Sequence, residues 1–285
     1  MSTARRPWLA ATALLLPTYA WLLLAVFLPL VAMLAFTFMN VAPFGNKPIV
    51  WTLRHYRAFA DQPYLLGVAW TTVSLALWTT AVSVVLGLLT ALAIVRTTTG
   101  AWRHVILLLV ILPFWTNGLV RVFSWTMVLR EGGFLDVFLH WIVPGAGSIG
   151  FLYSRSAIVL GFVHAYLPYT ILTCYVALVA IDESLIEAAR SLGARGWTVF
   201  WEVILPLARP GLVSGAVLTF VPVVGSFMEP RILGGRVGVT LGTVIEDQFT
   251  QAFNWPLGSA LSFTVLAAVL AVLATFSGVL RQGAR

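Results

Sequence analysis

The sequence predicts an all-α integral membrane protein with six transmembrane helices. Of its 285 residues, 60% are hydrophobic and only 9% are charged, and the mean hydropathy is +0.96. Soluble globular domains have about a quarter of their residues charged, so this composition excludes that class. Apolar stretches of about 20 residues, the length that crosses the hydrocarbon core of a bilayer, recur along the chain.

Six stretches are apolar and long enough to be spans, at residues 8–39, 67–95, 105–129, 157–181, 212–228 and 258–280. The first follows Arg5 and Arg6, an arrangement that also occurs in cleaved signal peptides. It is too long for the apolar region of a signal peptide and has no clear small-residue cleavage site. We therefore interpret it as a retained helix.

The third predicted span, residues 105–129, carries polar residues at helical spacing. Five residues would share one face of a continuous helix: Asn117, Arg121, Ser124, Trp125 and Val128. A rise of about 1.5 Å per residue would put Arg121 about 27 Å from Arg103, in the outer third of the bilayer. Either Arg121 extends its charged end to the interface, or it faces a polar cavity, because ionisable groups at depth usually turn away from lipid.

The fourth and fifth spans contain polar and helix-bending residues. We expect His164 to be a packed, hydrogen-bonded histidine, with contact to a solute as the alternative. Cys174 is the only cysteine, which excludes an internal disulfide. Pro222 and Gly225 predict a bend in the fifth span, since proline frees a backbone carbonyl and glycine loosens packing.

Basic residues beside the spans favour an orientation with both termini in the cytoplasm. That orientation leaves nine on the cytoplasmic side: Arg5, Arg6, Arg96, Arg103, Arg190, Arg195, Arg209, Arg281 and Arg285. The opposite side has seven: Lys47, Arg54, Arg57, Arg130, Arg155, Arg231 and Arg236. Those seven lie mostly in long segments, which count less in the rule. Arginines at a membrane surface meet anionic lipid, so the net charge of +7 predicts no nucleic-acid partner.

The motifs of common enzymes are missing from the sequence. A phosphate-binding loop needs a lysine after its glycine, and the only lysine, Lys47, is preceded by asparagine. The four histidines fall in different segments and none forms an H-E-x-x-H pair, so no metal site is predicted. An intramembrane hydrolase built from residues such as Ser226 and His164 is not indicated by any spacing. We therefore predict that the chain is not an enzyme.

Residues 182–210 form a polar segment between the fourth and fifth spans. Ser184 followed by Glu187 matches a capping box, which predicts a helix start at the serine. One face of that helix would hold Leu185, Ala188, Ala189 and Leu192, and Gly193 is suited to end it in a left-handed turn. A second short helix is expected at residues 197–204, closed by Pro206 and Pro210.

The same segment resembles the EAA motif of ATP-binding-cassette (ABC) importer permeases. Its pattern is EAA, three residues, glycine, nine residues and I-x-L-P, and the chain matches it with Val203 in place of the isoleucine. The resemblance implies a type I ABC importer permease fold, a single permease domain over residues 1–285 and a cytoplasmic coupling loop at 182–210. It assigns contact with an ATPase to Glu187, Ala188, Ala189, Gly193, Leu205 and Pro206.

The resemblance also implies partners. ATP and Mg²⁺ would be bound by a cytoplasmic ATPase homodimer, so this chain needs no cofactor. A second, different permease subunit and an extracytoplasmic solute-binding protein would complete the importer in a bacterial inner membrane. A channel or proton-coupled carrier is the alternative class, and the EAA spacing argues against it.

Three further segments are similar to the spermidine/putrescine branch of these permeases. They are "LPFWTNGLVRVFSW" at 112–125, "ILGG" at 232–235 and "WPLGSALS" at 255–262. The chain departs from the branch before the glycine pair, where Ser226 and Arg231 occupy positions that are commonly acidic and Glu229 occupies an apolar one. A path for a dication favours carboxylates, so an amino-acid-like, opine-like or phosphonate-like solute stays open.

The candidates for a solute path or gate are Asn117, Arg121, Trp125, Ser226 and Glu229. Counting along the spans puts Arg121 and Glu229 at similar depth. We therefore expect that these two side chains either pair directly or flank a gate.

Overall fold

The structure, a computed structural model, describes residues 7–43, 47–57, 61–143 and 150–282. In this part of the chain the regular structure is helical, apart from one isolated antiparallel bridge between Met39 and Trp51. Among these residues five helices are long and apolar enough to cross a membrane, and a bent pair of helices makes six if the pair is counted as one span. The all-α membrane fold is therefore confirmed. Three of the basic residues used for orientation, Arg5, Arg6 and Arg285, lie outside the described residues.

The chain forms two compact units. One consists of residues 1–61 and 245–264, and the other of residues 62–244 and 265–285. The first unit contains helix α1 (Pro7–Thr37) and the short helix η1 (Arg54–Arg57). Phe36 packs edge-on against Trp255, with the ring centroids 5.9 Å apart, and His55 Nε2 lies 2.9 Å from the Met39 carbonyl oxygen.

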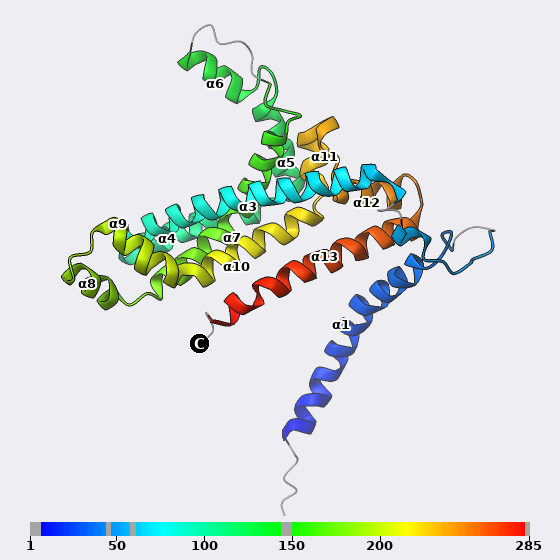
Figure 1. Ribbon diagram of the computed structural model, residues 1–285, viewed down its shortest axis with the longest axis horizontal. Helices are drawn as coiled ribbons and strands as arrows, with labels where there is room; N and C mark the ends of the chain where they lie inside the picture. Colours follow the sequence, from blue (N-terminus) through cyan, green and yellow to red (C-terminus); the bar gives the residue numbers. More distant parts are fainter. Residues whose placement is uncertain (1–6, 44–46, 58–60, 144–149, 283–285) are drawn as a thin grey trace, which may run out of the picture. The chain divides into compact units, whose positions relative to one another are not determined.

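The second unit is organised around three helices that lie side by side (Figure 1): α3 (Pro63–Thr97), α7 (Arg155–Val179) and α10 (Leu205–Gly225). Small residues allow their backbones to approach, which is how membrane helices pack. A Cβ at Gly87 would lie 2.8 Å from Thr170 Cγ2, and one at Gly215 would lie 2.7 Å from Thr173 Oγ1. The buried hydroxyls of Thr170 and Thr219 are hydrogen-bonded to each other at 3.1 Å.

The third predicted span is broken, and the prediction of one straight helix is wrong. Helix α4 (Gly100–Ile111) continues into η2 (Leu112–Trp115), and the chain then bends by 94° into α5 (Gly118–Leu129) and α6 (Phe134–Ile142). The break occurs at Asn117, whose backbone is extended and whose side chain accepts a hydrogen bond from the Leu119 amide at 2.8 Å. Asn117 thus caps a new helix. The predicted separation of about 27 Å between Arg121 and Arg103 assumed a straight helix, so it is wrong as well.

The fifth span begins earlier than predicted, and Pro206 and Pro210 do not end the helix before it. Helix α9 (Gly196–Val199) passes through η3, a π-helical turn at Phe200–Ile204, directly into α10. The Leu205 amide bonds to the Phe200 carbonyl, five residues back. This wider turn immediately precedes Pro206, which has no N–H to donate. One helical course therefore runs from Gly196 to Gly225 and contains Pro222.

Two short elements, α11 (Met228–Gly234) and η4 (Gly235–Val237), follow α10 and lead into α12 (Leu241–Thr250). The last span, α13 (Trp255–Gln282), includes the predicted residues 258–280. Figure 1 shows α11 beside α5 in the second unit, and α11 also packs against α7.

Candidate functional site

The predicted coupling loop at residues 182–210, called the coupling segment below, starts with helix α8 (Glu183–Ser191), which is capped by Asp182. The Asp182 carboxylate accepts a hydrogen bond from the Ser184 amide at 2.9 Å, and this bond lowers the pKa of the carboxyl. The predicted capping box is therefore wrong, because Ser184 already lies inside the helix. An aspartate at the N-cap satisfies an amide and complements the positive end of the helix dipole.

Gly193 ends α8 in a left-handed turn, as predicted, with φ of +84°. The Gly193 amide donates to the Arg190 carbonyl at 2.9 Å, and the Ala194 amide donates to the Ala189 carbonyl at 3.1 Å. These two bonds are those of a Schellman motif. A Cβ at Gly193 would meet nothing within 4 Å, so the glycine is required for its backbone conformation rather than for space.

The two sides of α8 differ in what they contact. Ile186 and Ala189 pack inward against a core that includes Ile204, whereas Leu185 is 47% exposed and Leu192 is 90% exposed. The single apolar face predicted for this helix is therefore not found, because Ala189 turns inward while Leu185 and Leu192 remain exposed. Glu187 and Ala188 are exposed as well, and Leu205 packs against the inner core. Pro206, partly buried, occupies the first turn of α10.

Two tryptophans beside α8 were not predicted as functional residues. Trp197 is 73% exposed and Trp201 is 49% exposed, with their ring centroids 5.5 Å apart. Their spacing of four residues puts them on the same face of a helix, and this spacing is the sequence signal that could have identified them. Leu185, Leu192 and these two tryptophans are thus the large apolar side chains that α8 and the start of the fifth span leave exposed.

The solute-path candidates fall on α5 and in the segment from the end of α10 to α11. Trp125 on α5 donates from Nε1 to Nδ1 of His164 on α7 at 2.9 Å, and the two rings meet edge to face. The prediction of a packed, hydrogen-bonded His164 is therefore confirmed. Asn117, in contrast, is exposed at the start of α5.

Glu229 is a buried carboxylate, 6% exposed, in the first turn of α11. It accepts a hydrogen bond from Ser226 Oγ at 2.6 Å. No ion pair within 4.0 Å joins Glu229 to Arg121 among the described residues, so direct pairing is not realised in this structure. The carboxylate nevertheless lies against α7, because a Cβ at Gly161 of that helix would be 3.8 Å from Glu229 Cγ. Helices α5, α7 and α11 pack against one another here, so their polar side chains and Ser226 lie in one region.

Glycines bring α11 close to α7 and support this polar region. A Cβ at Gly161 of α7 would lie 2.5 Å from Leu233 Cδ1, and one at Gly234 would lie 2.6 Å from Ile158 Cδ1. A Cβ at Gly242 would lie 2.3 Å from the carbonyl oxygen of Ser226, the residue that holds Glu229. In the part of the chain that the structure describes, no three His, Cys, Asp or Glu residues are grouped as metal ligands.

Comparison with known proteins agrees with this architecture. The family model described as "binding-protein-dependent transport system inner membrane component" matches residues 83–281. The spermidine/putrescine transport system permease protein PotB of Escherichia coli (strain K12) is 33% identical over 245 residues, covering 86% of this chain and 88% of that protein. PotB of Haemophilus influenzae is 34% identical over 256 residues, covering 88% of each chain.

The fold also matches a solved structure. The crystal structure of a bacterial ABC transporter involved in the import of the acidic polysaccharide alginate aligns with a TM-score of 0.78 at 18% identity. The alignment covers 98% of this chain and 96% of that one. The chain therefore belongs to the family of inner membrane components of binding-protein-dependent transport systems, as a multi-pass ABC importer permease.

Proposed function

We propose that this permease transmits the movement of a cytoplasmic ATPase to a solute gate in the membrane, and that its solute is a polyamine. The observation that carries the mechanism is the unbroken helical course from Gly196 to Gly225. It starts three residues after the Gly193 turn and ends beside Ser226. A continuous helix that joins an exposed docking surface to a buried polar region can couple displacement at one end to opening at the other.

The docking surface of the proposed ATPase contact consists of α8 and the start of the fifth span. The exposed Leu185, Leu192 and Trp197 supply apolar area, and the exposed Glu187 supplies a charge. The partner would be an ATPase homodimer that binds ATP and Mg²⁺. A second, different permease subunit and an extracytoplasmic binding protein would complete the assembly, with both termini of this chain in the cytoplasm.

Polyamine is the solute favoured by similarity to the PotB proteins and by the buried carboxylate of Glu229, which suits an ammonium group. Arg121, close to the same region, would favour a solute that also carries an anionic group, such as an amino acid or an opine. Since these two residues favour different solutes, binding and uptake decide between them.

The proposal that a partner ATPase supplies the energy is tested by comparing the purified chain with the assembled complex in lipid. The chain alone is expected to bind no nucleotide and hydrolyse no ATP, whereas the complex hydrolyses ATP faster when the loaded binding protein is added. Hydrolysis by the chain itself, free of contaminating ATPase, would contradict the assignment.

The polyamine assignment is tested first by titrating the cognate binding protein with spermidine, putrescine, amino acids and opines. Uptake of each labelled ligand that binds is then measured in proteoliposomes that contain the complex. Binding and uptake of spermidine or putrescine alone is the expected result. Uptake of only a zwitterionic solute would remove the polyamine assignment and leave the importer assignment intact.

A further inference from the structure

A cavity of about 510 Å³ lies behind the coupling helix, where α3 and α7 end. Part of its wall is apolar and comes from the last turns of these two spanning helices, with Leu92 and Val95 on α3 and Leu178 and Val179 on α7. The remaining wall carries charged side chains of α3, α4 and α8. A cavity with an apolar side at the end of membrane spans and a charged side beyond it matches the boundary between acyl chains and headgroups.

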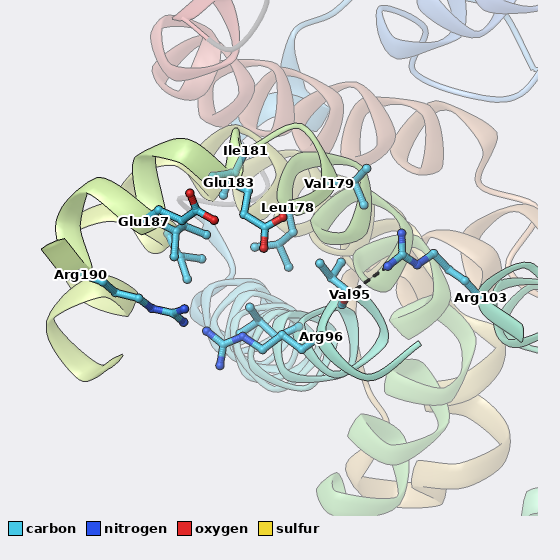
Figure 2. A pocket seen from close by; sticks show the side chains of 12 residues that line it. Val95, Arg96, Arg103, Leu178, Val179, Ile181, Glu183, Glu187 and Arg190 are labelled. Carbon is cyan, nitrogen blue, oxygen red and sulfur yellow. Dashed lines mark hydrogen bonds between the residues drawn. The ribbon is translucent and has the colours of Figure 1, made fainter. Parts of the chain in front are cut away.

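Three arginines line the cavity, and one of them is already occupied. Arg103 donates to the carbonyl oxygens of Val95 and Thr98, so it satisfies the end of α3. Arg96 and Arg190 form no side-chain hydrogen bond and no ion pair with any residue that the structure describes. Figure 2 shows their guanidinium groups pointing toward one another across the cavity from α3 and α8.

Two positive charges that lie close together repel each other, and an anion bound between them offsets that repulsion. Glu183 and Glu187 line the same cavity, but neither is within 4.0 Å of an arginine nitrogen among the described residues. In Figure 2 their carboxylates lie apart from the two converging guanidinium groups. The protein therefore supplies no partner for Arg96 and Arg190, although a guanidinium is shaped to bind a phosphate with two parallel hydrogen bonds.

We propose that this cavity binds the phosphate of an anionic phospholipid, held between Arg96 and Arg190, with its acyl chains against the ends of α3 and α7. The apolar wall favours a lipid over a soluble anion, which would gain nothing from it. A lipid bound there would bridge the coupling helix α8 to the spanning helix α3. This site involves neither the solute nor ATP, so its test is independent of the transport assignment.

The test counts lipids bound to the full chain in mild detergent by native mass spectrometry, with phosphatidylglycerol and phosphatidylcholine of identical acyl chains as probes. The chain is expected to bind phosphatidylglycerol more tightly than phosphatidylcholine. Because each basic residue near an anionic lipid contributes about fivefold in affinity, the double variant R96Q/R190Q is expected to lose about 25-fold for phosphatidylglycerol alone. The matched control is Arg195→Gln, an exposed arginine outside the cavity, which is expected to bind as the wild type does.

The variant R96K/R190K keeps both charges but loses the paired hydrogen bonds of the guanidinium groups, so its affinity is expected to lie between those of the wild type and R96Q/R190Q. Binding above that of R96Q/R190Q separates loss of charge from loss of fold. Circular dichroism and size-exclusion chromatography check folding, and the single variants replace the double one if it misfolds. Equal binding by R96Q/R190Q and the Arg195→Gln control would overturn the proposal. So would displacement of the lipid by millimolar inorganic phosphate, which would assign a soluble anion. If R96Q/R190Q binds lipid as the wild type does but no longer recruits the ATPase, the two arginines contact the ATPase and not a lipid.

Discussion

Gly193 offers the sharpest test of the coupling segment, because its requirement is conformational. Its φ of +84° is in the left-handed region, where an L-residue costs about 1–2 kcal/mol relative to glycine. A Cβ there meets no atom within 4 Å, so steric clash adds nothing to that cost. For Gly193→Ala we therefore expect local opening of the turn to become about 5–30 times more frequent.

Gly196 is the matched control three residues away. A Cβ at Gly196 also meets nothing within 4 Å, but its φ is not positive and it lies in the first turn of α9. Gly196→Ala is thus expected to leave the segment unchanged or to stabilise it by about 0.4–1 kcal/mol. The two substitutions add the same methyl group to open space with opposite expected signs.

Hydrogen exchange on the chain in lipid nanodiscs measures the difference. The Ala194 amide, bonded to the Ala189 carbonyl, should exchange about 5–30 times faster in Gly193→Ala and no faster in Gly196→Ala. Gly193→Asp adds a charge at the proposed ATPase surface, so we expect normal insertion, weaker ATPase association and loss of transport. Identical protection of Ala194 in both alanine variants would refute the strained turn, and full transport by Gly193→Asp would refute the coupling assignment.

Three further predictions address the other sites. Glu229→Gln and Arg121→Gln are expected to reduce uptake at normal complex yield, and wild-type uptake by both would remove them from the solute path. The Cβ of Gly242→Ala would lie 2.3 Å from the Ser226 carbonyl oxygen, so this variant should be less stable by about 1–3 kcal/mol in thermal melts. Gly225→Ala is the control, because a Cβ at Gly225 meets nothing within 4 Å. Burial lowers the pKa of His55, so its contribution to stability is present above the unfolded value of about 6.5 and is lost as pH falls below that value. Melts from pH 8 to 5 should therefore show a flatter profile for His55→Gln than for the wild type, and a steeper one would contradict this sign.

The sequence alone was sufficient for features that depend on composition and local conformation. Apolar length predicted the spans, because the thickness of the hydrocarbon core fixes how many residues are needed. Gly193 predicted the end of α8, because few other residues adopt a left-handed turn without strain. The EAA spacing indicated the family, since it combines that turn with residues at fixed distances along the chain.

Tertiary structure decided the features that depend on residues far apart in the sequence. A hydropathy pattern is the same for a straight span and a broken one, so the 94° bend at Asn117 was missed. Prolines usually end helices, but the π-helical turn before Pro206 lets the fifth span continue into the coupling segment. The hydrogen bond between Trp125 and His164 joins residues 39 positions apart, and it exists because α5 packs against α7 after the bend. Local propensity contains no information about such contacts, which is why only the folded chain determines them.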